Sequence, residues 1–341
     1  MSAHAAAGGA GSADTPARLR QILVIADGTA PGLGPGTSDL NATDPPAPDS
    51  ASLAQVLQAA LAKDAALIQQ LAGVPTAVQT AGEGDTATDF AARIWHCPTP
   101  AAAGYLTRTD PARARTVQRL VEQAGGPPVL TEEDATAIAL AAAALHYLRR
   151  LGRDPYRSRI LVADALRLPI LSPLLLACGF PDISMWNAPD TAWFPLPRAA
   201  RDADVVIDLS RQDPPPGTPA ATIGAGATEL DLDRPEGSVI TRRGLDPGAL
   251  IAPGLLRAIT EHPAGALPFG LGVYQMCAEA VARAMLARPR SDDLFRAGPI
   301  PSAAAQSIAT AVALSIHVAL TTQDQDNGWP PRSQRRPHAG G

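Results

Sequence analysis

Residues 160–179, "ILVADALRLPILSPLLLACG", decide the fold class of this chain. The stretch opens on a short apolar run, passes through a turn and closes in a leucine-rich helical pattern. A strand, a turn and a helix in this order begin a dinucleotide-binding unit. Apolar strand patterns recur at 183–188 and 205–210, with a short segment at 197–204 between them. Strands and helices that alternate at this spacing predict a parallel sheet covered on both faces.

The turn in this stretch contains no glycine. Residues 164–169 read Asp-Ala-Leu-Arg-Leu-Pro. A pyrophosphate binds backbone N–H groups at a helix N-terminus, and glycines allow it to come close. Leu168 adds bulk at this point, and Pro169 has no N–H to donate. The sequence therefore predicts a degenerate cofactor loop, in which Asp164 and Arg167 remain as the candidate contacts.

A second glycine-rich loop follows the apolar run Ile22–Ile25, which we predict to be a buried strand. The loop contains Gly28, Gly32, Gly34 and Gly36, but it leads into a proline-rich connector and not into a helix. A phosphate-binding loop needs the helix that follows it. This loop is therefore a weak phosphate signal.

Residues 51–73 predict the next helix, because their apolar side chains recur at helical spacing. The apolar stripe consists of Leu53, Val56, Leu57, Ala60, Leu67, Ile68 and Leu71. Asp64 falls near the middle of this stripe, where a carboxylate needs a partner. Lys63, the only lysine among the 28 basic residues, falls on its margin.

The remaining pattern supplies further helices and strands. A strand is predicted at 74–80, a possible strand at 221–227, and helices at 85–95, 110–125, 132–152, 273–289 and 301–323. Thr131 and Asp134 form a capping-box pattern, which places the start of the central helix at about Glu132. Gly152 marks its end.

Composition narrows the class of protein. The chain has 341 residues, of which 46% are hydrophobic, and this is enough for two α/β domains with cores of their own. A net charge of −5 argues against a nucleic-acid partner, and charges interrupt the longest apolar stretches too soon for a membrane span. Three widely spaced cysteines and an N-terminus without an apolar signal core predict a reduced, cytoplasmic location. Residues 1–19 and 323–341 are expected to be disordered.

The order of these segments resembles the malic enzymes over residues 20–322. The matching words are "IADGTAPGLG", a helix ending in "LAGV", "PVLTEEDATAIALAAAALHYLRRLG", the stretch at 160–179, "APGLLRAI" and "AEAVARAML". The resemblance implies a two-domain α/β fold, with a malic-enzyme-like N-terminal domain at 20–130 and a Rossmann-like parallel-sheet domain at 131–322. The closing helices of the second domain are able to pack back on the first. The resemblance also implies a homodimer.

The family implies a chemistry whose parts are altered in this chain. Malic enzymes oxidise and decarboxylate malate with NAD or NADP and a divalent metal, using a tyrosine and a lysine for proton transfer and three carboxylates as metal ligands. The family's tyrosine lies upstream of the first glycine loop, whereas all four tyrosines here follow that loop. The lysine position aligns with Asp64, and Lys63 is one residue away. Thr107 and Arg108 stand where a Glu and an Asp would bind the metal, and a guanidinium cannot bind magnesium.

The third metal ligand belongs to the acidic word before the central helix. Glu132, Glu133 and Asp134 stand there, one residue short of the family's pattern. Carboxylates in a first helical turn also favour the macrodipole, which gives these residues a purely structural explanation. The exchanged charges suggest that Asp64 and Arg108 form an ion pair in place of the lysine and the metal. No metal site is predicted.

Two further groups carry weaker signals. His96 and Cys97 are neighbours that would point to opposite faces of a strand, which argues against a nucleophile pair. Trp186, Trp193 and Phe194 form an aromatic cluster where the resemblance places the adenosine pocket, and we expect them to fill it.

Three classes of function stay open. The first is a non-catalytic homologue that acts as a binding or oligomeric partner. The second is a repurposed enzyme that acts on a small carboxylic acid without a cofactor, through Lys63, Asp64, Arg108, Glu132 and Glu133. The third is an NAD(P)-dependent malic-type oxidoreductase with atypical motifs, which would need NAD or NADP together with Mg²⁺ or Mn²⁺.

Overall fold

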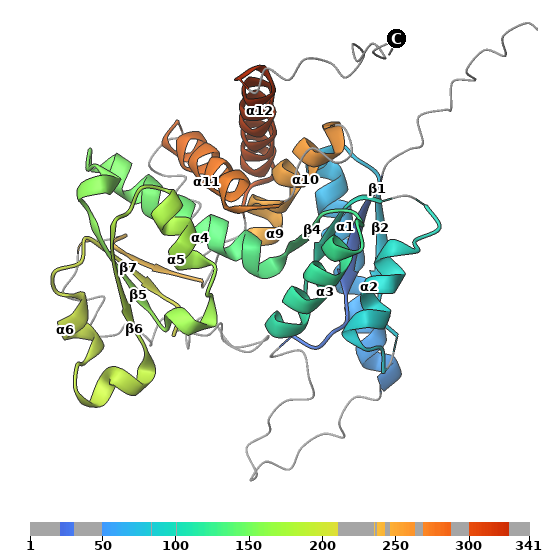
Figure 1. Cartoon of the computed structure of the whole chain (residues 1–341), viewed down its shortest axis with the longest axis horizontal. Coiled ribbons are helices and arrows are strands. Elements are labelled where there is room, and N and C mark those ends of the chain that lie inside the picture. The colour runs from blue at the N-terminus through green and yellow to red at the C-terminus, as the bar shows by residue number, and fades with distance from the viewer. Residues whose placement is uncertain are drawn as a thin grey trace, which may run out of the picture.

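Two parallel sheets of four strands each form the framework of the chain (Figure 1). The computed structural model describes residues 21–30, 50–82, 84–99, 101–210, 235, 237–242, 246–262, 269–287 and 300–326. Each sheet has its own covering helices, and the predicted two-domain α/β fold with a Rossmann-like sheet is confirmed.

The first sheet has the strand order β2-β1-β3-β4. Its strands are β1 (Gln21–Ala26), β2 (Thr76–Thr80), β3 (Ala101–Leu106) and β4 (Val129–Thr131). Side chains of β1 alternate between two cores, because successive residues of a strand face opposite ways. Ile22 and Val24 pack with α1 (Ser50–Ala72) and α10 (Ala252–Glu261), whereas Leu23 and Ile25 pack with α2 (Ala87–Trp95) and α3 (Pro111–Gln123).

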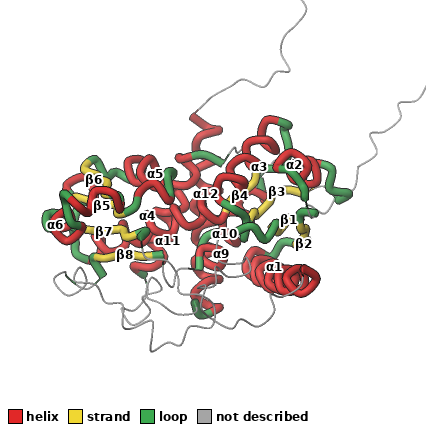
Figure 2. The backbone as a smooth tube through the Cα atoms, turned by 90° about the horizontal axis from the view of Figure 1, so that it is seen from below, coloured by secondary structure: helices red, strands yellow, loops and turns green. Residues whose placement is uncertain are grey.

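Helix α4 (Glu132–Arg150) runs between the two sheets (Figure 2). Its predicted start is confirmed, since Thr131 caps the helix and both arms of the capping box with Asp134 are present. Its predicted end is confirmed too, with Gly152 in the left-handed conformation at φ 66°. The alanine-rich sequence leaves α4 buried on nearly every side, because small side chains let neighbouring helices approach closely.

The second sheet has the strand order β6-β5-β7-β8. Its strands are β5 (Arg159–Ala163), β6 (Asp182–Trp186), β7 (Val205–Asp208) and β8 (Val239–Thr241). The helical elements around them are η1 (Pro155–Arg157), η2 (Ala165–Arg167), α5 (Leu171–Ala177), η3 (Ala188–Ala192) and α6 (Leu196–Ala200). The three predicted strands are confirmed, and β8 is one that the sequence did not reveal.

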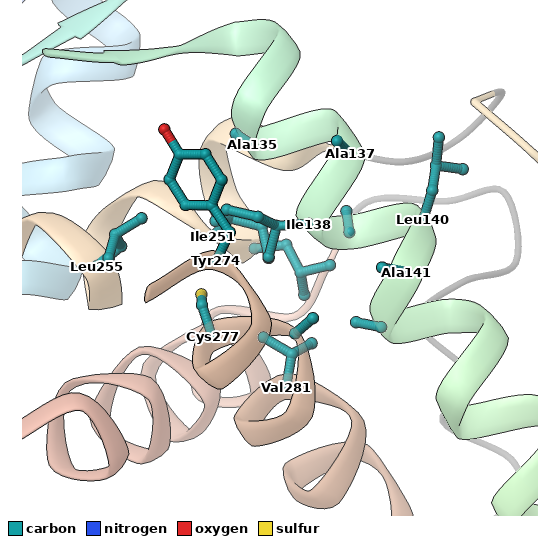
Figure 3. Close-up of a cluster of buried hydrophobic side chains, with 14 of the residues drawn as sticks. Ala135, Ala137, Ile138, Leu140, Ala141, Ile251, Leu255, Tyr274, Cys277 and Val281 are labelled. Carbon is teal, nitrogen blue, oxygen red and sulfur yellow. The ribbon is translucent and has the colours of Figure 1, made fainter. Parts of the chain in front are cut away.

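The remaining helices join the two halves. They are α9 (Pro247–Leu250), α11 (Leu271–Leu286) and α12 (Ser302–Asp326). Helix α11 packs on α4, α5 and α12, and α10 packs on α1, on α12 and on the first sheet. Figure 3 shows the apolar contact between α4 and α11, where Cys277 and Val281 face the alanine-lined side of α4. The closing helices therefore contact the first sheet directly and the second domain through α4 and α5.

Several sequence expectations were wrong in detail. Val56 is 61% exposed and not part of the buried stripe, whereas Leu61, which the stripe omitted, is fully buried. His96 and Cys97 do not lie on a strand, because His96 caps the C-terminus of α2. The possible strand at 221–227 and the loop glycines beyond residue 30 lie outside the described residues.

Helix α12 contains one stretch that meets the criterion for a membrane span, contrary to the expectation from the sequence. Residues Ser302–Ala319 of α12 are long and apolar enough to cross a bilayer by length and composition. In the structure 39% of this window is buried inside the protein, where it packs on α10 and α11. A core helix of this kind meets the same criterion, so the finding is weak evidence for a membrane span.

Candidate functional site

The candidate site lies at the carboxyl ends of β1, β3 and β4. Ligands of parallel α/β sheets bind outside this edge, because the loops that leave the strands there converge. Asp27 follows β1, the pair Thr107–Arg108 follows β3, and Glu132 follows β4. Asp64 approaches the same edge from α1.

Arg108 and Asp64 form the predicted ion pair. Arg108 Nη2 lies 2.7 Å from Asp64 Oδ2, and about a quarter of each side chain is exposed. Burial raises the pKa of Asp64 above its ordinary value, and the charges of Asp246 and Glu132 raise it further. Arg108 acts in the opposite direction through its charge and its hydrogen bond. Burial and two neighbouring carboxylates therefore disfavour the charged form of Asp64, and the guanidinium of Arg108 opposes them.

Glu132 fixes the turn that carries Arg108. Its Oε2 accepts hydrogen bonds from Thr107 Oγ1 at 2.8 Å and from the Arg108 backbone N at 2.9 Å. Arg108 has φ 50°, a left-handed conformation that a residue with a side chain rarely adopts. Backbone strain of this kind persists where the surrounding structure enforces it, and it is common at functional sites.

One donor of Arg108 is unused. Arg108 Nε is buried and has no hydrogen-bond partner among the described residues. A buried donor without an acceptor is unfavourable by about 1–3 kcal/mol. A ligand oxygen at this position would remove that penalty, and a carboxylate matches the fork geometry of a guanidinium.

Tyr105 is a site residue that the sequence analysis missed. Its phenol is completely buried, and burial together with the charges of Glu132, Asp64 and Asp246 raises its pKa well above the ordinary value. A hydrogen bond with the Thr107 side chain acts in the other direction. The phenol therefore stays protonated at neutral pH. The only sequence signal for Tyr105 was its position two residues before Thr107. The strand that carries it was not predicted, because it begins with three alanines.

Asp246 brings the second domain to this site. It caps α9, where Asp246 Oδ1 accepts from Ala249 N at 2.9 Å. The turn it begins packs on the tyrosine, since a Cβ atom added to Gly248 would lie 3.3 Å from the Tyr105 hydroxyl. The site therefore combines carboxylates from α1, α4 and α9 around one guanidinium and one phenol.

The loop after β1 is anchored separately. Asp27 Oδ2 lies 2.5 Å from Arg113 Nε, and Asp27 Oδ1 accepts from both the N and the Oγ1 of Thr29. Thr29 Oγ1 in turn accepts from Asp110 N at the start of α3. This network holds the loop against α3 and gives Asp27 a structural role.

The structure separates the predicted catalytic residues into two groups. Asp64, Arg108 and Glu132 lie together. Lys63 is exposed on α1, one residue away from the side that faces the site. Glu133 faces Arg115 of α3 at 3.6 Å, and burial is the main cause that raises its pKa.

The residues present do not fit a divalent cation. Mg²⁺ and Mn²⁺ need several converging oxygen ligands. Within the part of the chain that the structure describes, no group of three or more His, Cys, Asp or Glu side chains could hold a metal ion. Asp64 is bound to Arg108, and Glu132 is bound to the turn beside it.

The turn after β5 does not fit a pyrophosphate. Asp164 has φ 61° and forms an ion pair with Arg167, so the two candidate cofactor contacts bind each other. Leu168 is buried in the turn, and α5 begins only at Leu171. The short turn η2 therefore stands between the end of β5 and the first α-helix, whereas a dinucleotide site has its α-helix N-terminus directly after the strand.

The aromatic cluster does not fill a pocket as a unit. Trp186 is buried, and its Nε1 donates to the carbonyl of Phe194 at 2.7 Å. Trp193 is 89% exposed, which overturns the expectation that it fills an apolar space. These three side chains line a hollow beside β6.

Known structures share this architecture. The malic enzyme of Entamoeba histolytica has a TM-score of 0.62 at 16% identity over 90% of this chain and 70% of its own. The NAD-dependent malic enzyme of Thermotoga maritima has a TM-score of 0.60 at 16% identity over 89% of this chain and 84% of its own. The chain has a malic-enzyme-like fold. No protein-family model and no curated protein matches its sequence, so the likeness to malic enzymes is one of fold.

Proposed function

We propose that the site at the end of the first sheet binds a small carboxylic acid without a metal ion or a nicotinamide cofactor. The observation that carries the proposal is Arg108, whose guanidinium is fixed by Asp64 while its buried Nε has no partner in the described part of the chain. A carboxylate oxygen on Nε would complete the hydrogen bonding of that guanidinium.

Each neighbour has a role in this binding. Asp64 orients the guanidinium, and Glu132 holds the strained backbone from which it projects. The Tyr105 phenol keeps its proton, because its pKa is raised, and so it adds no negative charge beside the ligand.

The same groups support proton transfer on the bound acid. Asp64 has a raised pKa and lies at the ligand position, which are the properties of a general acid or base. The repurposed enzyme is therefore the reading that the geometry favours over a non-catalytic homologue. We infer that metal- and NAD(P)-dependent oxidative decarboxylation has been lost, since neither the residues around Arg108 nor the turn at Asp164 fits its group.

An NAD(P)-dependent malic-type oxidoreductase is the second candidate. The similarity to the NAD-dependent malic enzyme of Thermotoga maritima favours it. The two candidates make opposite predictions for ligand binding, because only the second requires the turn after β5 to accept a dinucleotide.

Thermal unfolding in the presence of ligands tests the proposal. A ligand that binds only the native state stabilises it and so raises the melting temperature. At a free ligand concentration of one hundred times Kd, the gain in the free energy of unfolding is about 2.7 kcal/mol. We expect malate and succinate to raise it without Mg²⁺, and NAD and NADP to leave it unchanged. Arg108→Ala should abolish the carboxylate effect, and Arg167→Ala is the matched control that should keep it. Malate-dependent reduction of NAD in the presence of Mn²⁺ would establish the second candidate instead.

A further inference from the structure

A hollow of about 490 Å³ lies in the second domain, away from the site at Arg108. It is bounded by β5, by β6 and by the segment from Asp190 to Ala203, which contains α6. Its size lies within the range of small-molecule sites, roughly 300–1,000 Å³.

The hollow exists because α6 is short. A connection between parallel strands normally covers the sheet face with a full helix. Here α6 has five residues, and the core beneath it includes Leu161, Trp186 and Ala200. The amino-terminal part of the same face, at Arg159 and Asp182, remains open as part of the hollow.

Aromatic rings form one wall. Trp193 stands 89% exposed, and the bond from Trp186 Nε1 to the Phe194 carbonyl fixes the loop that carries it. The guanidinium of Arg198 lies 5.3 Å from the centroid of the Phe194 ring. This wall therefore already holds one cation by a cation–π contact.

The rim of the hollow is acidic. Asp182, Asp190 and Asp202 line it, together with one cation, Arg159. Arg159 Nε lies 3.1 Å from Asp182 Oδ2, so this pair is neutralised. Asp190 uses one oxygen to accept from Asn187 N, and Asp202 makes no ion pair with any residue that the structure describes. Asp190 and Asp202 thus form no ion pair with a described residue, and they line the same hollow as the exposed Trp193 ring.

We infer that this hollow binds a small organic cation, a guanidinium or an ammonium group carried on an apolar stem. The charged head lies between Asp190 and Asp202, and the stem lies along Trp193 and Met185, whose side chain is exposed on β6. The inference is independent of the carboxylate site, because the two sites share no residue.

Calorimetric titration with butylguanidinium tests the inference, with butylurea as the uncharged compound of the same shape. Butylguanidinium should bind, and butylurea should not. Trp193→Ala should weaken Kd about tenfold, because the apolar stem loses the ring surface that covers it. Asp202→Asn should weaken it about threefold. Glu122→Gln removes an exposed charge of α3 in the first domain and should leave Kd unchanged, as should Arg108→Ala.

Three results would overturn the inference. The first is that butylurea binds as tightly as butylguanidinium. The second is that Kd is unchanged in both Trp193→Ala and Asp202→Asn. The third is that butylguanidinium does not saturate the protein below about 10 mM. Both side chains are exposed, so the variants should fold, and a melting temperature equal to that of the parent protein verifies this.

Discussion

The carboxyl edges of the two sheets have the same place in the same kind of sheet, but they differ in chemistry. At the first edge, Arg108 is held by Asp64 and Glu132, which come from helices 44 and 24 residues away in sequence. At the second edge, Asp164 binds Arg167 of its own turn. The first edge is assembled from distant segments, whereas the second closes on itself.

This difference illustrates that a fold and the chemistry of its sites make separate demands on the sequence. Strands such as β5 and β7 need only apolar side chains on both faces, a condition that many sequences meet. A phosphate turn needs particular backbone conformations and open N–H groups, and substitutions in a few positions remove them. The fold can therefore be malic-enzyme-like while Asp164 and Arg167 bind each other in the turn after β5.

The largest expected effect concerns the helix that supports the first edge. Asp134 is fully buried and accepts from Arg115 Nη1 and Gln118 Nε2, both at 2.8 Å. Asp134→Ala should lower the free energy of unfolding by about 3–5 kcal/mol, because Arg115 loses its buried partner. Urea unfolding monitored by circular dichroism measures the change. Asp134→Asn, which keeps an acceptor, should be less destabilising, and a loss under about 1 kcal/mol in Asp134→Ala would refute the role given to this network.

Replacing Arg108 or Arg167 by alanine tests whether only the first edge binds a carboxylate. Arg108→Ala should weaken succinate binding by about 30-fold or more, since a charge-assisted hydrogen bond and its countercharge are lost. Arg167→Ala should leave it unchanged, because Arg167 serves only its own turn. Titration calorimetry of both variants measures the effect. Equal losses in the two variants would place the carboxylate elsewhere.

The response to pH sharpens the comparison further. Burial raises the folded-state pKa of Asp64, so protonation favours the native state. Its contribution to stability should therefore increase as pH falls from neutral through the folded pKa towards the unfolded value of about 4. Asp64→Asn should remove this part of the slope. Arg108 lowers the pKa of Asp64, so Arg108→Ala should shift the rise to higher pH. A wild-type curve parallel to that of Asp64→Asn between neutral pH and about pH 4 would contradict this sign.

The sequence predicted features that depend on residues close together in the chain, and it missed features that depend on tertiary contacts. Thr131 and Asp134 are three residues apart, and their capping box fixed the start of α4 correctly. Strand β3 was missed because three alanines give no strand signal, and Tyr105 was missed with it. Lys63 shows the limit of counting along a helix, where one residue is a turn of about 100°.

Asp64 and Arg108 are the exception, a long-range pair that was predicted correctly. Their exchanged charges, read against the malic enzyme pattern, were the signal. Asp246 gave no such signal, because a helix cap 182 residues from Asp64 has no sequence relation to it. Its presence at the site follows from the packing of α9 on α4 and α1.

The smallest expected effect is that of Asp164→Gly, which tests whether this residue alone prevents ligand binding at the edge of the second sheet. Asp164→Gly relieves the left-handed backbone at φ 61° but loses an exposed ion pair and adds freedom to the unfolded chain. These contributions oppose one another, so stability should change by less than about 1 kcal/mol. NAD should still leave the melting temperature unchanged, because Leu168 remains buried in the turn and α5 still begins at Leu171. If NAD raised the melting temperature of Asp164→Gly, then residue 164 alone would prevent NAD binding at the turn after β5. The two edges would then differ by one backbone position and not by their whole set of side chains.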